Sequence, residues 1–264
     1  MDAGTTTEAG PLGRVDPARP APPGTVPRPP LGLATLTVVA GFAGLIAMLV
    51  VLGSIAEGVR AQEVFALDTW ATPFLHGIAS PPLDTVMLRL TDIGSSLVIV
   101  PLLAGALGAL IWKHRYGAAA FLAIATTGSV LLDATMKAIF QRPRPQLDYA
   151  AVLPDYSFPS GHTMNAVIFY VALALIIWSV FGRRIGLAAL TLAVVVALGV
   201  GVSRIYLGYH YLTDVVGALL AGISWLVVVG AAFRARPTWW SWGSKATPVP
   251  ADQRPTGGRP AGAR

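Results

Sequence analysis

The fold class is decided by residues 185–233, which read IGLAALTLAVVVALGVGV-SRIYLGYHY-LTDVVGALLAGISWLVVVGAAF. Two apolar stretches, 185–202 and 212–233, flank a short connection that carries polar residues. Each is close to the roughly 20 residues that an α-helix needs to cross about 30 Å of hydrocarbon. Neither shows the alternation over about 10 residues that is typical of a membrane-spanning strand. The stretch therefore predicts two membrane-spanning helices.

Four further apolar stretches precede this pair, and the whole composition agrees with a membrane protein. Hydrophobic residues make up 54% of the chain and charged residues only 12%, with a mean hydropathy of +0.64, whereas a soluble domain has about 25% charged residues. We therefore predict an all-α fold, a single bundle of six transmembrane helices. The predicted spans are residues 33–54, 93–112, 117–140, 163–182, 185–202 and 212–233.

The regions outside the spans define the domain boundaries. Residues 1–31 and 244–264 are rich in Pro, Gly and Ala and poor in large apolar residues, which predicts disordered tails around one membrane domain, 32–243. The segment 57–92 is too polar to span. Within it, Phe65, Leu67, Trp70, Phe74 and Leu75 predict a helix at the outer membrane interface. The sequence has no cysteine, which excludes disulfides and thiolate chemistry.

The basic residues predict the orientation in the bilayer. If the N-terminus is cytoplasmic, 13 of the 19 Lys and Arg residues fall on the inner side of the membrane. The net charge of +6 is spread over short loops and tails, so we expect the lipid bilayer, and no nucleic acid, as the partner. Both termini are predicted to be cytoplasmic, and the oligomeric state is left open.

Three polar clusters interrupt the apolar pattern, at residues 137–145, 159–162 and 203–214. The first ends the third predicted span, the second starts the fourth, and the third joins the fifth to the sixth. Because six spans alternate in direction, all three clusters are expected at the extracytoplasmic face. Nothing in the spacing of the clusters forces this agreement, so topology and clusters support each other.

The clusters supply groups that suit a phosphate. Lys137, Arg144 and Arg204 are three cations near one plane, and the planar fork of Arg matches phosphate oxygens. Ser160 and Gly161 open a predicted helix whose first amide groups and dipole favour an anion. The cations occupy the role that a divalent ion would otherwise fill, so no metal and no other cofactor is expected.

Histidines in the same clusters suit covalent phosphoryl transfer. His210 and Asp214 are four residues apart and share a helix face. Asp214 can hold one imidazole nitrogen and leave the other free as the nucleophile. His162 is suited to protonate the leaving oxygen. Together these residues predict a site that transfers a phosphoryl group through His210.

Two neighbouring residues are candidates for support. Asp133 precedes Lys137 by four residues, which favours a salt bridge that holds Lys137 in place, and a proton relay is the alternative. Arg142 lies beside the site and is a candidate for steering anions toward it.

The three motifs, K-x6-R-P, P-S-G-H and S-R-x5-H-x3-D, resemble the signature motifs of the type 2 phosphatidic acid phosphatase family, which is related to vanadium haloperoxidases and bacterial acid phosphatases. All three are present in order, within residues 90–233. The resemblance implies an antiparallel helical bundle and a metal-independent activity. It also implies roles by position: nucleophile His210, its partner Asp214, general acid His162, and phosphate binders Lys137, Arg144, Ser160, Gly161 and Arg204.

The expected function is therefore hydrolysis of a lipid phosphate monoester or diphosphate through a phosphohistidine. Members of this family in membranes act on phosphatidic acid, phosphatidylglycerol phosphate or polyprenyl diphosphates. A lipid substrate follows here from the predicted place of the site at the end of the spans. Three alternatives stay open: a lipid-linked phosphotransferase that uses the same site, a vanadate haloperoxidase, and a non-enzymatic membrane protein with a relic site.

Overall fold

The protein is all-helical wherever it is described. The computed structural model describes residues 31–63, 65–150 and 153–234, and in these ranges it has eight α-helices and no strand. The predicted tails, 1–31 and 244–264, lie outside these ranges except for Leu31. The helices are α1 (Leu31–Arg60), α2 (Ala66–His76), α3 (Pro81–Ile93), α4 (Ser96–Trp112), α5 (Tyr116–Phe140), α6 (Gly161–Phe181), α7 (Arg183–Tyr206) and α8 (Leu212–Arg234).

Membrane-spanning helices are confirmed. Among the described residues, α1, α5, α6, α7 and α8 are each long and apolar enough to cross a bilayer. A sixth span is reached when α3 and α4, which meet at an angle of 43°, are taken together. The expected second span, 93–112, needs correction, because Ile93 ends α3 and α4 begins only at Ser96. With 17 residues, α4 is shorter than the roughly 20 that cross the hydrocarbon core, so it needs α3 to complete the span.

The segment 57–92 contains a helix where the interface helix is predicted, since Leu67, Trp70, Phe74 and Leu75 all lie on α2. Residues 57–60 continue α1, and residues 81–92 belong to α3, so the expectation that the whole segment lies outside the spans needs correction. Pro81 and Pro82 occupy the first turn of α3, where a missing N–H costs nothing.

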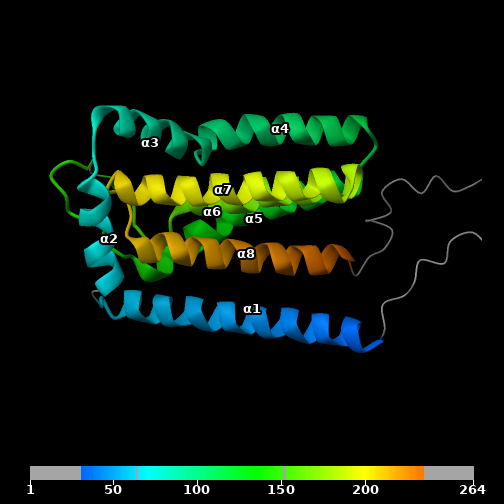
Figure 1. Ribbon diagram of the computed structural model, residues 1–264, viewed down its shortest axis with the longest axis horizontal. Coiled ribbons are helices and arrows are strands. Elements are labelled where there is room, and N and C mark those ends of the chain that lie inside the picture. Colours follow the sequence, from blue (N-terminus) through cyan, green and yellow to red (C-terminus); the bar gives the residue numbers. More distant parts are fainter. Residues whose placement is uncertain (1–30, 64, 151–152, 235–264) are drawn as a thin grey trace, which may run out of the picture. The chain divides into compact units, whose positions relative to one another are not determined.

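The chain divides into two compact units, Met1–Ala43 and Gly44–Arg264, and the second unit contains the candidate site. Within this unit, α6 packs against α4, α5, α7 and α8 (Figure 1). The core of the unit includes fully buried side chains on or next to these helices: Phe121, Leu122, Phe158, Met164, Ile168 and Phe169. Close packing of α5 on α8 requires Gly128, because a Cβ at that position would overlap the Trp225 ring.

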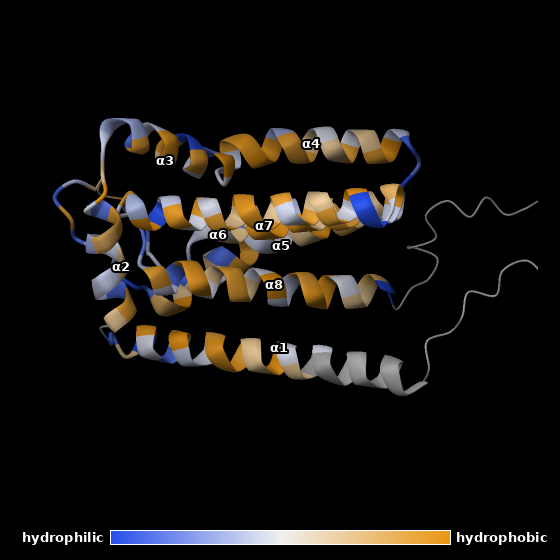
Figure 2. Cartoon of the chain, viewed as in Figure 1, coloured by the Kyte–Doolittle hydropathy of each residue, from blue (hydrophilic) through white to orange (hydrophobic). Residues whose placement is uncertain are grey.

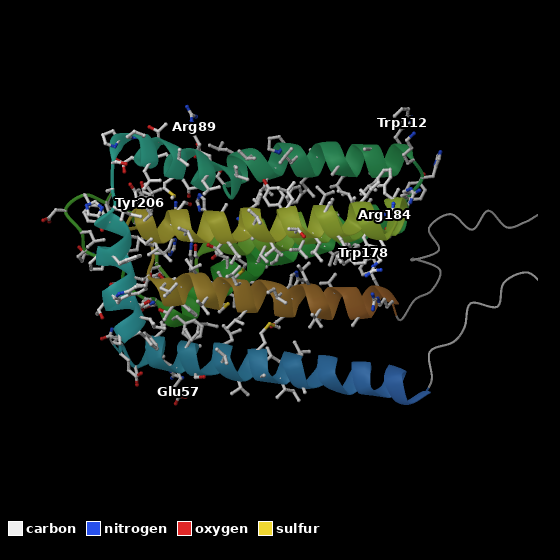
Figure 3. All side chains as sticks on the ribbon, in the orientation of Figure 1. Glu57, Arg89, Trp112, Trp178, Arg184 and Tyr206 are labelled. Atoms are coloured by element: carbon white, nitrogen blue, oxygen red, sulfur yellow. The ribbon has the colours of Figure 1, made fainter. Side chains whose placement is uncertain are left out.

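The second unit has two chemically different ends. Hydrophobic residues cover most of α4, α7 and α8, whereas the loop after α4 is hydrophilic (Figure 2). Arg184, in the first turn of α7, lies at the opposite end of that helix from Tyr206, the residue that closes it beside α2 (Figure 3). Helix direction therefore places the ends of α5 and α7 and the starts of α6 and α8 together, away from Arg184 (Figure 1).

Candidate active site

A cavity of about 260 Å³ lies where α5 and α7 end and α6 and α8 begin. Seven of the ten residues singled out from the sequence line it, and they come from all three motifs. Asp214, Ser160 and Arg142 do not line it. The lining residues are Ser96, Asp133, Lys137, Arg144, Leu153, Asp155, Gly161, His162, Asn165, Arg204 and His210.

The end of α5 directs Arg144 into this cavity. Helix α5 stops at Phe140, and Gln141 adopts a left-handed conformation with φ 45°. Pro143 and Pro145 follow, and a proline keeps the residue before it out of the helical region. Arg144 Nη1 then donates to the carbonyl oxygen of Tyr209 at 2.7 Å and lies 3.2 Å from His210 Nε2.

His210 sits in the turn between α7 and α8. Gly208 makes this turn possible, since its φ of +72° is costly for residues with a Cβ. His210 Nδ1 lies 3.4 Å from Asp214 Oδ2, and His210 Nε2 lies on the side of Arg144. This geometry suits a tautomer in which Nδ1–H points to Asp214 and Nε2 keeps its lone pair.

The surroundings of His210 favour the neutral imidazole. Burial is the largest cause and lowers its pKa, Asp214 opposes this, and the charges of Arg204 and Arg144 lower it further, to about 4. Burial and positive neighbours both disfavour a charged imidazolium. Near neutral pH, His210 therefore has an unprotonated Nε2 beside the cavity, as a nucleophile requires.

Asp214 is fully buried behind His210 and is held on both oxygens. Its Oδ2 accepts from Ser157 Oγ at 2.8 Å and from the amide of Tyr211 at 2.9 Å. Its Oδ1 accepts from Arg142 Nη1 at 2.5 Å. The guanidinium of Arg142 thus contacts Asp214 and does not line the cavity.

Asp155 is a cavity residue that sequence reasoning did not select. Its Oδ2 accepts from Lys137 Nζ at 2.9 Å and its Oδ1 from Arg144 Nη2 at 2.7 Å. Partial burial would raise the pKa of Asp155, but the hydrogen bonds and charges of Lys137 and Arg144 lower it to about 2. Asp133 also pairs with Lys137, at 3.3 Å, as the four-residue spacing predicted. No motif pointed to Asp155, which lies 18 residues after Lys137.

Arg204 brings a donor without a partner to the cavity. Its Nη1 donates to Thr91 Oγ1 at 3.1 Å, and its guanidinium lies 4.4 Å from the centre of the Tyr209 ring. Its buried Nε has no hydrogen-bond partner within the described ranges. Since buried donors are rarely left unsatisfied, this N–H is suited to bind an incoming oxygen.

The start of α6 contributes His162 and Gly161. A Cβ on Gly161 would lie 3.0–3.2 Å from the Asp133 carboxylate, so glycine lets α5 approach the helix N-terminus closely. The hydroxyl of Ser160, a predicted phosphate binder, is buried and lies 2.9 Å from Thr163 Oγ1. Asn165 also lines the cavity. Its position three residues after His162, on the same helix face, was a signal that could have identified it.

A comparison with known families agrees with this geometry. The PAP2 superfamily profile matches residues 116–241, which include every motif residue. Phosphatidylglycerophosphatase B of Bacillus subtilis is 34% identical over 174 residues, covering 64% of this chain and 84% of that protein. The chain belongs to the PAP2 superfamily. This finding confirms the family that the three motifs predicted.

Other relatives of this PAP2 protein are also named as phosphatases. The putative undecaprenyl-diphosphatase YbjG of Escherichia coli is 35% identical over 132 residues, covering 48% of this chain and 63% of that protein. Undecaprenyl-diphosphatase BcrC of B. subtilis is 27% identical over 164 residues, covering 56% and 75%. These names confirm the predicted enzyme class, a phosphatase.

Solved PAP2 structures share the helical arrangement. The transmembrane PAP2 type phosphatidylglycerolphosphate phosphatase from B. subtilis superposes with a TM-score of 0.66 at 25% identity, covering 73% of this chain and 96% of that one. LpxE of Aquifex aeolicus superposes with a TM-score of 0.52 at 26% identity, covering 63% and 96%. The chain is thus a multi-pass integral membrane protein, as predicted.

Proposed function

We propose that this PAP2 protein hydrolyses a lipid phosphate monoester or diphosphate at the extracytoplasmic membrane face, through a phosphohistidine on His210. The observation that carries the proposal is the placement of His210 Nε2 at a cavity that also holds Lys137, Arg144 and Arg204. A nucleophile and three cations in one small cavity suit phosphoryl transfer, where catalysis is mostly positioning and charge stabilisation.

The proposed reaction has two steps. In the first, His210 Nε2 attacks phosphorus, the bond from phosphorus to the lipid-side oxygen breaks, and His162 gives that oxygen a proton. In the second, water attacks the phosphohistidine and gives a proton to His162, the P–N bond breaks, and inorganic phosphate leaves. Asp214 stabilises the positive charge that develops on the imidazole, and the three cations bind the phosphoryl oxygens.

The opposite end of the unit supports the proposed face. Lys113 and Arg115 follow α4, and Arg183 and Arg184 start α7, at the end away from the cavity. Loops rich in Lys and Arg favour the cytoplasmic side. The cavity then belongs to the extracytoplasmic side, with both termini cytoplasmic.

A lipid substrate is supported by the membrane location and the relatives. The cavity lies at the ends of spanning helices, within reach of a lipid head group. Phosphatidylglycerol phosphate, phosphatidic acid and polyprenyl diphosphate are the substrate candidates. Metal independence is part of the proposal, because side-chain cations can neutralise the phosphoryl oxygens.

Phosphate release by purified protein in detergent, with excess chelator, tests the function across these three lipids. We expect release from at least one lipid and none from His210→Ala. Release in the mutant would show that the nucleophile is misassigned. A folded protein that releases no phosphate from any lipid would contradict the hydrolase proposal. Transfer of phosphate to an added lipid or glycan acceptor would then favour the phosphotransferase.

A further inference from the structure

Helix α2 has an unusual distribution of polar and apolar side chains. Its exposed residues include Leu67, Trp70 and Phe74, and the rings of Trp70 and Phe74 stack at 4.9 Å. Asp68, by contrast, is only 4% exposed. An apolar outer face suits the membrane interface, but a buried carboxylate requires compensation by partners. The partners of Asp68 therefore indicate what the helix does.

These partners connect α2 to the start of α8. Asp68 Oδ1 accepts from the amide of Thr213 at 2.8 Å, and its Oδ2 accepts from Thr213 Oγ1 at 2.6 Å. The same Oδ2 accepts from Arg142 Nη2 at 2.8 Å. Thr213 is the residue before Asp214, so α2 contacts the backbone that positions the catalytic carboxylate.

Arg142 links the two carboxylates. Its Nη2 donates to Asp68, and its Nη1 donates to Asp214 Oδ1 and to Thr213 Oγ1, the latter at 2.8 Å. Arg142 is 8% exposed, and its guanidinium lies 4.1 Å from the centre of the Tyr211 ring. A planar guanidinium fork held by two carboxylates and an aromatic ring has little freedom to rotate.

We propose that Asp68 and Arg142 are positioning residues for catalysis: Asp68 orients Arg142, and Arg142 holds Asp214 in the rotamer and the ionised state that direct His210. The proposal rests on the function proposed above for His210. It makes α2 a part of the catalytic apparatus, although none of its residues lines the small cavity. Arg142 donates to Asp214 Oδ1, while Oδ2 accepts from Ser157 and Tyr211 and lies 3.4 Å from His210 Nδ1.

Asp68 and Arg142 carry opposite charges close to Asp214. Their removal should therefore shift the protonation of His210 in opposite directions. Removing Arg142 leaves Asp214 less compensated and favours protonated His210. Removing Asp68 has the opposite effect. The other charged or titratable groups around His210 stay constant in both variants: Asp214, Arg204, Arg144, Lys137, Asp133, Asp155, His162, Tyr209 and Tyr211.

The experiment compares Asp68→Asn, Arg142→Gln and the double variant with the wild type in detergent, over pH 3 to about 8. For both single variants we expect kcat to fall about 10- to 100-fold, as when outer partners of metal-bound histidines are removed. KM should stay within about threefold, because the phosphate-binding cations are untouched. The acid limb of kcat/KM, which is its decline as the pH is lowered, should move to lower pH in Asp68→Asn and to higher pH in Arg142→Gln.

The double variant and a matched control separate positioning from folding. Asp68→Asn/Arg142→Gln restores the charge balance, so its acid limb should return toward the wild-type pH while kcat stays low. Asp84→Asn neutralises another carboxylate that connects an outer helix to α7, the acceptor of the 2.6 Å hydrogen bond from Tyr206 Oη. It should leave both kcat and the acid limb unchanged. If Arg142→Gln does not fold, Arg142→Lys replaces it, with the acid limb retained and kcat reduced.

The outcomes distinguish this proposal from the proposed function. Wild-type protein that releases no chelator-resistant phosphate, or an active His210→Ala, overturns the proposed function. Suppose that the wild type is active, that His210→Ala is inactive, and that the Asp68 and Arg142 variants fold and have a normal kcat. This result overturns only the positioning role. Displacement of both acid limbs in the same direction also overturns it, because the two charges are opposite.

Discussion

The carboxylate of Asp155 forms an ion pair with Lys137, with Oδ2 2.9 Å from Nζ, although the sequence predicts that Lys137 binds phosphate. The same carboxylate pairs with Arg144 at 2.7 Å. Two anions cannot share these donors without repulsion, so an incoming phosphate has to displace Asp155. With its pKa lowered to about 2, Asp155 is ionised at every pH where the enzyme is expected to work.

Asp155→Asn is therefore expected to improve phosphate binding. We expect KM for the lipid, and the inhibition constant of inorganic phosphate, to fall about 1.4- to 5-fold, since an exposed ion pair contributes roughly 0.2–1 kcal/mol and about 1.4 kcal/mol corresponds to tenfold. Asp148→Asn is the matched control, because Asp148 is an exposed carboxylate in the same connection that does not line the cavity. Equal effects of the two substitutions would show that only the net charge matters.

Activity should persist to unusually low pH for a histidine nucleophile. The folded-state pKa of His210 is about 4, below the ordinary 6.5, so the imidazole becomes protonated only as the pH falls through about 4. Above that pH, the nucleophile is neutral and competent. We expect the acid limb of kcat/KM near pH 4 for a substrate whose own ionisation is corrected for. An acid limb at about 6.5 would show that the imidazole is not held neutral.

Arg204→Lys is expected to impair turnover although the charge is kept. Lys lacks the planar fork and the Nε donor that has no partner within the described ranges. Loss of one donor to a developing oxyanion costs about 10²- to 10³-fold in kcat in other enzymes, and we expect a loss of that order. Steady-state kinetics in detergent measure it. A variant with wild-type kcat would indicate that Arg204 acts only as a point charge.

The packing of α5 on α8 predicts that two Gly→Ala substitutions affect the stability of the protein differently. Gly128→Ala forces the Trp225 ring to move and breaks the fit that lets Trp225 Nε1 donate to the carbonyl of Ala125 at 3.0 Å. Overpacking costs about 1–3 kcal/mol, so thermal unfolding in detergent should occur at a lower temperature. Gly105→Ala is the control, because its Cβ would meet no atom within 4 Å. Equal melting temperatures for both variants would contradict this account of the packing.

Hydropathy and spacing were sufficient to predict much of this protein. The spans around α5 to α8 followed from long apolar stretches. The four-residue spacing also pointed to the pair of His210 and Asp214, but His210 lies in the turn before α8 and not on the helix face that the spacing assumed. The break between α3 and α4 was not predicted, because the second span was taken to begin at Ile93 and to include Gly94 and Ser95. Propensity alone does not reveal such a bend when packing decides it.

Arg142 was a candidate for support from the sequence, but its partners behind the site could not be predicted, for a different physical reason. Asp68 and Thr213 are 145 residues apart, and Asp68 and Arg142 are 74 apart. Such pairs arise only when the fold brings α2 against α8, and no local period connects them.

Trapping the covalent intermediate tests the central claim most directly. The purified enzyme would be mixed with a lipid labelled at the phosphate, quenched in alkali after milliseconds and digested, and the labelled peptide located by mass spectrometry. We predict an acid-labile, alkali-stable phosphoryl group on His210, formed at a rate no slower than kcat and absent from His210→Gln. Phosphate release at the full rate with no label on His210, or with label on another residue, would contradict the account.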